Sequence, residues 1–110
     1  KNGDGEFAPF FGMPAYTMTL LPRLAERSGA TVLFAYCERI GDLAFALRIE
    51  PAPEGIASSD TRIATTALNA MVERIARRSA AQYQWTYKRY TLQPCMDGSD
   101  NPYRELEGRA

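Results

Sequence analysis

Histidine is missing from the 110-residue sequence. Its absence excludes, within this chain, the serine–histidine–aspartate triad, the cysteine–histidine pair and any zinc site built on imidazole. Only two cysteines are present, Cys37 and Cys95, and two thiolates cannot complete a tetrahedral metal site. We therefore expect neither a metal ion nor any other cofactor. A lone pair of cysteines also does not make the disulfide framework of a small secreted domain, so we expect reduced thiols in a cytoplasmic setting.

Excess charge of either sign is missing too. Thirteen basic and thirteen acidic side chains cancel, so the chain has no overall field that would attract nucleic acid. We expect no nucleic-acid partner. Any anionic ligand must be held by a local group of basic side chains.

Long apolar runs are also missing. The longest, around residues 7–11 and 31–37, are far shorter than the roughly 20 residues that cross a bilayer, so no segment is predicted to span a membrane. The sequence starts with the loop-like run Lys1–Gly5, where a natural protein would normally begin with methionine. We interpret the chain as a fragment of a longer protein.

The first part of the sequence predicts a strand and a helix. Glu6–Phe11 is a short apolar run interrupted by a proline, which is typical of an edge strand, and the turn Gly12–Pro14 follows it. Leucines then recur at helical spacing over Thr19–Ser28. Thr19 suits the N-cap because Pro22 is tolerated only in the first turn, and Gly29 is a typical stop.

A hairpin is predicted next. Thr31–Glu38 is nearly continuous apolar sequence, which indicates a strand buried on both faces. Leu43–Glu50 alternates apolar and other residues, and the short Ile40–Asp42 connection favours antiparallel pairing of the two strands. With the Glu6–Phe11 strand, these two predict an α/β fold with one mixed β-sheet.

A long helix and a tail complete the predicted fold. Ser59 or Asp60 caps a helix that runs to Ser79 with one continuous apolar stripe, and this helix and the earlier one are predicted to cover the sheet. Beyond Gln93 the sequence is rich in turn residues and poor in apolar ones. We therefore predict one domain over residues 1–94 and a surface or disordered tail over 95–110.

Aromatic and basic side chains are concentrated between Gln82 and Thr91. Their periodicity fits a strand as well as a helix face. Rings with polar tips next to cations suit a membrane interface or a phosphorylated glycolipid, but the same rings can instead pack on the preceding helix and close a core. Both interpretations stay open, and they are compatible.

Two residues outside this segment are further candidates for a binding site. Arg39, at a strand end, could meet an anionic head group or an acyl carrier, although solvated arginines are common there. Thr17 offers a hydroxyl, although capping also uses threonines in this region. The predicted substrate-binding residues are therefore Arg89, Trp85, Tyr83, Lys88, Arg39 and Thr17.

Three stretches together resemble the lipid A biosynthesis acyltransferases of the lauroyl/myristoyl type. They are Phe7–Gly12 with the threonine-bearing turn and helix after it, the strand end Arg48–Pro51, and the aromatic run Gln82–Tyr90. The last is the most specific, because the family has a similar Glu-Gln-Tyr-x-Trp-x-His-x-Arg-Phe run. Here Tyr87 stands where many members have histidine, and Ala81 stands where they have an acid.

The resemblance implies an activity. Members move a fatty acyl chain from acyl carrier protein to a lipid A precursor, in lipopolysaccharide biosynthesis, at the cytoplasmic face of the Gram-negative inner membrane. Their general base is a histidine five positions before an acid, which by family order would lie upstream of Lys1, as would the membrane anchor. The chain is thus expected to be the later half of a glycerolipid/lipid A acyltransferase-type fold, and inactive alone.

Two other interpretations remain. The chain could be a non-catalytic interaction or membrane-surface-binding domain whose exposed aromatic residues do no chemistry. It could also belong to a related acyltransferase with a phospholipid acceptor.

Overall fold

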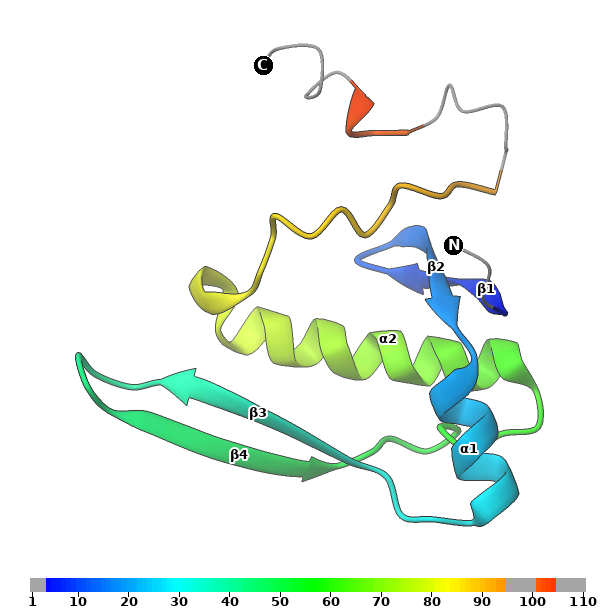
Figure 1. The fold of residues 1–110 in the computed structure, drawn as a ribbon, viewed down its shortest axis with the longest axis horizontal. Coiled ribbons are helices and arrows are strands. Elements are labelled where there is room, and N and C mark those ends of the chain that lie inside the picture. Colours follow the sequence, from blue (N-terminus) through cyan, green and yellow to red (C-terminus); the bar gives the residue numbers. More distant parts are fainter. Residues whose placement is uncertain (1–3, 95–100, 105–110) are drawn as a thin grey trace.

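The computed structural model describes residues 4–94 and 101–104. Helix α2 passes through the middle, with the β1–β2 hairpin on one side and the β3–β4 hairpin and α1 on the other (Figure 1). In chain order the elements are β1 (Gly5–Phe10), β2 (Met13–Met18), α1 (Leu20–Ser28), β3 (Leu33–Arg39), β4 (Phe45–Pro51), α2 (Thr61–Arg78) and the 3₁₀ helix η1 (Ala80–Gln82).

The β1–β2 hairpin turns within two residues. Phe10 pairs with Met13, and the residues between them, Phe11 and Gly12, have φ of 48° and 78°. Two successive positive φ values are what a type I′ turn requires, and its twist matches that of the flanking strands. The strand β2 was not predicted, because Pro14 made its first residues resemble part of a turn.

The β3–β4 hairpin is antiparallel, as predicted, but one of its faces is open. Leu33 of β3 is 58% exposed, and Leu47 of β4 is 69% exposed. The prediction that the first strand is buried on both faces is therefore wrong for the described structure. The opposite face carries charged and polar residues that bond to α2, including Glu50, which accepts a hydrogen bond from Arg74 at 2.6 Å.

The predicted single mixed sheet is wrong. The described strands form two separate sheets, each of two antiparallel strands. The turn at Phe11 and Gly12 returns the chain at once, so β1 takes β2 as its partner instead of the later strands. The α/β class itself is confirmed, since helices pack on strands in the described chain.

Both predicted helices are confirmed, although the Thr19 side chain makes no capping hydrogen bond and donates to the Asp4 carbonyl instead. Thr19 occupies the N-cap position of α1, and Gly29 ends it in the left-handed conformation with φ of 63°. Asp60 caps α2 with a carboxylate that accepts the amide of Arg62 at 2.9 Å. Within the described residues, neither helix combines the length and the apolar character needed to cross a bilayer.

The core lies between the β1–β2 hairpin and α2, and alanines make up most of its buried apolar residues, with Phe10 and Met71 among the larger ones. Ala8 and Ala15 of the hairpin and Ala64 of α2 are at most 1% exposed. Larger apolar side chains of α1, such as Leu24, stay exposed. The hairpin and α2 therefore form the best-packed part of the described chain, and the candidate site lies beside it.

Candidate functional site

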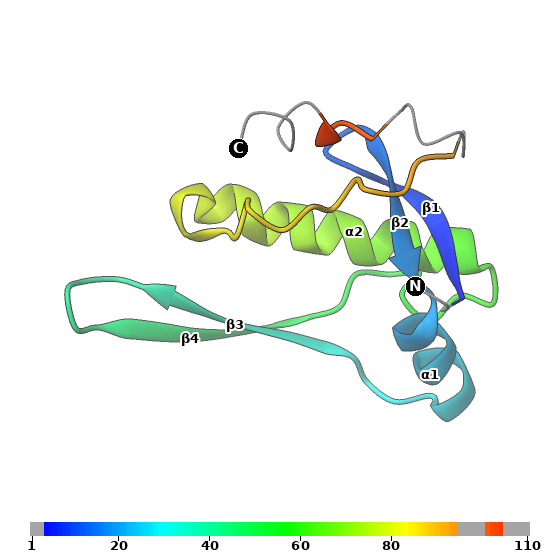
Figure 2. The ribbon, with the colours of Figure 1, turned by 45° about the horizontal axis from the view of Figure 1, so that its top comes forward.

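The aromatic and basic segment leaves α2 through η1 and runs back along the helix toward the β1–β2 hairpin (Figures 1 and 2). Beyond Gln82, which ends η1, its described residues form turns and bends. Neither of the two periodic structures considered for this segment is present. The segment is therefore positioned by side-chain contacts, of which those of Arg89 are the most extensive.

Arg89 is half-buried and binds three groups of the hairpin and α2. Its guanidinium donates hydrogen bonds to the carbonyl oxygen of Tyr16, to Thr17 Oγ1 at 2.9 Å and to Asn69 Oδ1 at 3.1 Å. The guanidinium carbon also lies 5.5 Å from the centre of the Phe10 ring. We call Arg89, Thr17 and Asn69 the Arg89 cluster.

The Thr17 hydroxyl uses all of its hydrogen-bonding capacity within the cluster. It donates to the carbonyl of Ala15 at 2.9 Å and accepts from both Arg89 and the Asn69 amide, the latter at 2.9 Å. A hydroxyl has one proton and two lone pairs, so nothing is left over. Thr17 is 4% exposed, and its contact with Arg89 is the route by which it can influence a ligand.

Asn69 was not identified from the sequence. It is 3% exposed in the middle of the apolar stripe of α2, and its amide also donates to the carbonyl of Ala8 at 3.3 Å. A carboxamide inside an otherwise apolar helix face is a sequence signal for a buried hydrogen-bond network, since an unpaired amide there would cost stability. The sequence thus carries an indication of a buried network at Asn69, although Asn69 is not among the predicted site residues.

Arg89 has no acidic partner in the part of the chain that the structure describes. The ion pairs found there join other residues, such as Arg23 with Asp4 on α1 and the chain before β1. The Arg89 cluster is thus a partly buried cationic centre held in place by neutral oxygens.

A groove of about 760 Å³ opens beside the cluster. Its lining combines the Arg89 cluster with residues of α1, of α2 and of the chain that leads into β3. Apolar side chains from β2, α1 and α2 form most of the walls, among them Met18, Leu20, Leu21, Leu24, Leu68 and Val72. Its size and lining are those of a pocket for a small amphiphilic molecule.

The other aromatic candidates pack around the turn of the first hairpin. The Tyr83 and Trp85 rings are 4.7 Å apart, and Trp85 lies 5.6 Å from the Phe11 ring. The Arg77 guanidinium lies 4.8 Å from the centre of the same Phe11 ring. Trp85 remains 55% exposed, although its indole N–H donates to the carbonyl of Ala80. Tyr83 and Trp85 thus make packing contacts and still present part of their surface to solvent.

Glu73 of α2 fixes the same turn. Its carboxylate accepts the Phe11 amide at 2.8 Å and the Arg77 guanidinium at 2.8 Å. The Arg77 contact and, second, the Phe11 amide hold the pKa of Glu73 below its ordinary value. The hydrogen bond from the Phe11 amide to Glu73 helps to hold Phe11 at a positive φ, which a bulky residue seldom adopts.

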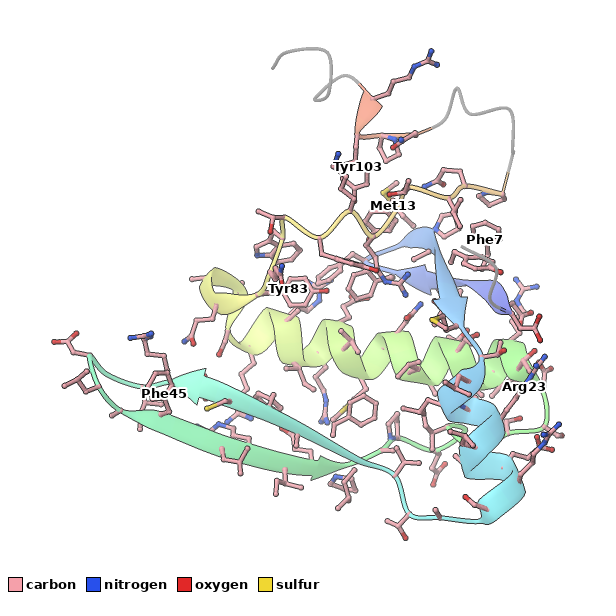
Figure 3. All side chains as sticks on the ribbon, in the orientation of Figure 1. Phe7, Met13, Arg23, Phe45, Tyr83 and Tyr103 are labelled. Atoms are coloured by element: carbon pink, nitrogen blue, oxygen red, sulfur yellow. The ribbon has the colours of Figure 1, made fainter. Side chains whose placement is uncertain are left out.

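Arg39 lies apart from the cluster. Both backbone groups of Arg39 are bonded by the Gln82 side-chain amide, and its guanidinium donates to the carbonyl of Asp42 and lies 4.9 Å from the ring of Phe45. Phe45 is near the tip of the β3–β4 hairpin, whereas Tyr83 is next to the end of α2 (Figure 3). Lys88 is exposed.

The predicted site residues therefore fall into separate places. Arg89 and Thr17 are in direct contact, Tyr83 and Trp85 are in contact with each other, and Arg39 is at the far hairpin. Within the described residues, no group of three or more acidic or cysteine side chains is placed to hold a metal ion. The predicted tail lies outside the described residues, except for 101–104, where the Tyr103 hydroxyl accepts the amide of Tyr90.

Comparison with protein-family models gives one match, over residues 1–91, to the model described as bacterial lipid A biosynthesis acyltransferase. A search of the curated proteins finds no match. The matched residues include both hairpins, both α-helices and the whole Arg89 cluster.

Proposed function

Because this chain belongs to the bacterial lipid A biosynthesis acyltransferase family, we propose that it is the C-terminal part of an enzyme of lipopolysaccharide biosynthesis. The enzyme transfers a fatty acyl chain from acyl carrier protein to a phosphorylated lipid A precursor. The observation that carries the proposal is the family match over residues 1–91 in a sequence without histidine.

The missing histidine decides which part of the reaction this chain can serve. An acceptor hydroxyl must lose its proton as it attacks the thioester carbonyl, and a base with a pKa near neutrality does this best. The chain has no imidazole, and the carboxylates of Glu38 and Glu73 have lowered pKa values because hydrogen bonds and arginines stabilise their charged forms. We assign the base to the histidine–acid pair of the family, in a portion of the enzyme outside this sequence.

The contribution of this chain is then to substrate binding. Arg89 offers a fixed cation, Tyr83, Trp85 and Lys88 offer the amphipathic rings and charge of a membrane interface, and Arg39 faces solvent for an acyl carrier or head group. Thr17 acts by orienting Arg89. In this proposal residues 1–94 are the later half of an acyltransferase-type domain at the cytoplasmic face of the inner membrane.

The first prediction concerns activity. The purified 110-residue polypeptide, given radiolabelled acyl carrier protein thioester and a lipid A precursor, should transfer no acyl chain above the uncatalysed background. The full-length gene product, tested in parallel with the lipid A precursor and with a phospholipid acceptor, should acylate the former.

Either of two results contradicts this assignment. Turnover by the 110-residue polypeptide would show that its own residues supply the base. A full-length protein that acylates neither acceptor, or only the phospholipid, would remove the proposed reaction.

A further inference from the structure

The lining of the groove beside the Arg89 cluster combines one cation with mostly apolar side chains. Among the described residues that line it, Arg89 is the charged one. Leucines of α1, of which Leu20 and Leu24 are 60% and 59% exposed, and Leu68 and Val72 of α2 supply much of the apolar wall. A cavity lined by one cation and otherwise mostly by apolar carbon matches a molecule with an anionic group and a hydrocarbon chain.

Arg89 retains capacity for such an anion. Its three hydrogen bonds go to uncharged oxygens, and a guanidinium has further N–H donors. No carboxylate among the described residues neutralises it. A partly buried charge without a counter-ion is costly, and an arginine presents donors in the geometry that phosphate oxygens accept.

We propose that this groove binds the acyl chain of a phosphorylated lipid, with the phosphate at Arg89 and the hydrocarbon along Leu20, Leu24 and Leu68. The inference rests on the proposed function, which supplies an acylated and phosphorylated acceptor, and it assigns that acceptor a place in the fold. Asn69 and Thr17 hold the guanidinium by hydrogen bonds and are positioning residues.

The positive charge of Arg89 favours a lipid over a protein segment as the ligand of the groove. An apolar helix laid along the leucines would exclude water from Arg89 and supply no counter-ion, and no described carboxylate is paired with this arginine. A lipid phosphate removes that cost while its chain covers the exposed carbon of α1.

The test uses the full-length protein in detergent micelles and a dodecyl phosphate probe with a diazirine near the end of its chain. Irradiation should label peptides of α1 and α2 that contain Leu24 and Leu68. A probe with the same chain and a maltoside head should label them with an apparent Kd about tenfold higher, since it lacks the charge-assisted bonds to Arg89.

Two variants and a matched control locate the ligand. Arg89→Gln should raise the apparent Kd of the phosphate probe about tenfold and leave that of the maltoside probe unchanged. Leu24→Glu should weaken both probes, and because Leu24 is 59% exposed its replacement leaves folding intact. Arg27→Gln, which removes a charge from the exposed face of α1 outside the groove, should change neither.

Competition separates the sources of the phosphate. Unlabelled lipid A precursor should displace the probe at lower concentration than phosphatidic acid, and inorganic phosphate should not displace it. The proposal is overturned if neither Arg89→Gln nor Leu24→Glu changes the labelling, or if only peptides without Leu24 and Leu68 are labelled. Displacement of the probe by phosphatidic acid alone also overturns it. If the full-length enzyme still acylates the precursor in that case, the proposed function stands without this groove.

Discussion

Thr17 is the residue on which three parts of the chain meet. Its hydroxyl bonds to the Ala15 carbonyl on its own strand, to Asn69 of α2 and to Arg89 of the segment after η1. Because it is 4% exposed, water cannot replace these bonds when one is removed. The position therefore links stability to the placement of the cationic centre.

Thr17→Val tests this link. Valine keeps the shape but removes one acceptor each from the Asn69 amide and the Arg89 guanidinium, so the free energy of unfolding should fall by about 1–3 kcal/mol. Urea denaturation of the 110-residue chain, followed by the fluorescence of its single tryptophan, Trp85, measures the change. Thr86→Val is the control, because Thr86 is exposed. Equal stability of the two variants would show that the cluster contributes nothing.

Residue-scale prediction from the sequence succeeded in part, for a physical reason. Arg89 and Thr17 were both chosen as candidates, but nothing in the sequence indicated that they touch, since they are 72 positions apart. The place of Asn69 in the apolar stripe of α2 could have suggested a buried hydrogen bond, but not its partners Ala8 and Thr17, which are 61 and 52 positions away. Hydrogen bonds between distant segments are decided by packing, which the local pattern does not contain.

Helix and strand boundaries depend on shorter-range forces. Gly29 ends α1 as predicted, with φ of 63°, because a residue without Cβ adopts the left-handed conformation at little cost. The strand β2 was missed because Pro14 resembles a turn residue. In the structure Pro14 belongs to β2 and pairs with Pro9 of β1. The positive φ of Phe11, which sets that pairing, depends on a bond to Glu73 from a remote helix.

Gly29→Ala isolates the backbone term at the element scale. No atom lies within 4 Å of a Cβ added at Gly29, so the expected loss of about 1 kcal/mol in the free energy of unfolding comes from backbone strain alone. Gly41→Ala is the matched control. Its added Cβ would meet Ala44 at an ordinary 3.5 Å, and stability should change little. Thermal unfolding of both variants measures the difference, and equal melting temperatures would refute the left-handed cap.

At the scale of the whole molecule, the described chain is less compact than an independent domain. Its radius of gyration is 15.9 Å, against about 13 Å for a compact domain of 100 residues. The outward face of the β3–β4 hairpin exposes Leu33, Phe45, Leu47 and Ile49. The sequence predicted the strands of this hairpin but not their separation from β1, because strand partners depend on turns and on distant contacts.

This open face should make the isolated chain associate. Exposed apolar strands with unpaired edges attract one another, and a charge on the face opposes this. Leu47→Lys should therefore shift the 110-residue polypeptide toward monomer in analytical ultracentrifugation without changing its circular dichroism. Arg27→Lys, which keeps the charge at an exposed site on α1, serves as the control. An unchanged sedimentation profile would argue that the face is not what brings chains together.

The contact between the β3–β4 hairpin and α2 depends on charged groups of the hairpin: Glu50 pairs with Arg74 and Arg78 of α2, and Glu38, which is paired with Arg48 inside the hairpin, accepts a hydrogen bond from the Ser79 hydroxyl at the end of α2. Salt weakens such a contact, because the Debye length over which surface charges interact shrinks from about 10 Å at 0.1 M ionic strength to about 3 Å at 1 M. The β1–β2 hairpin packs on α2 through buried apolar side chains and buried hydrogen bonds, so its contact with α2 should be less sensitive to salt. At high salt concentration we therefore expect the β3–β4 hairpin to loosen from α2 while the β1–β2 hairpin stays in place.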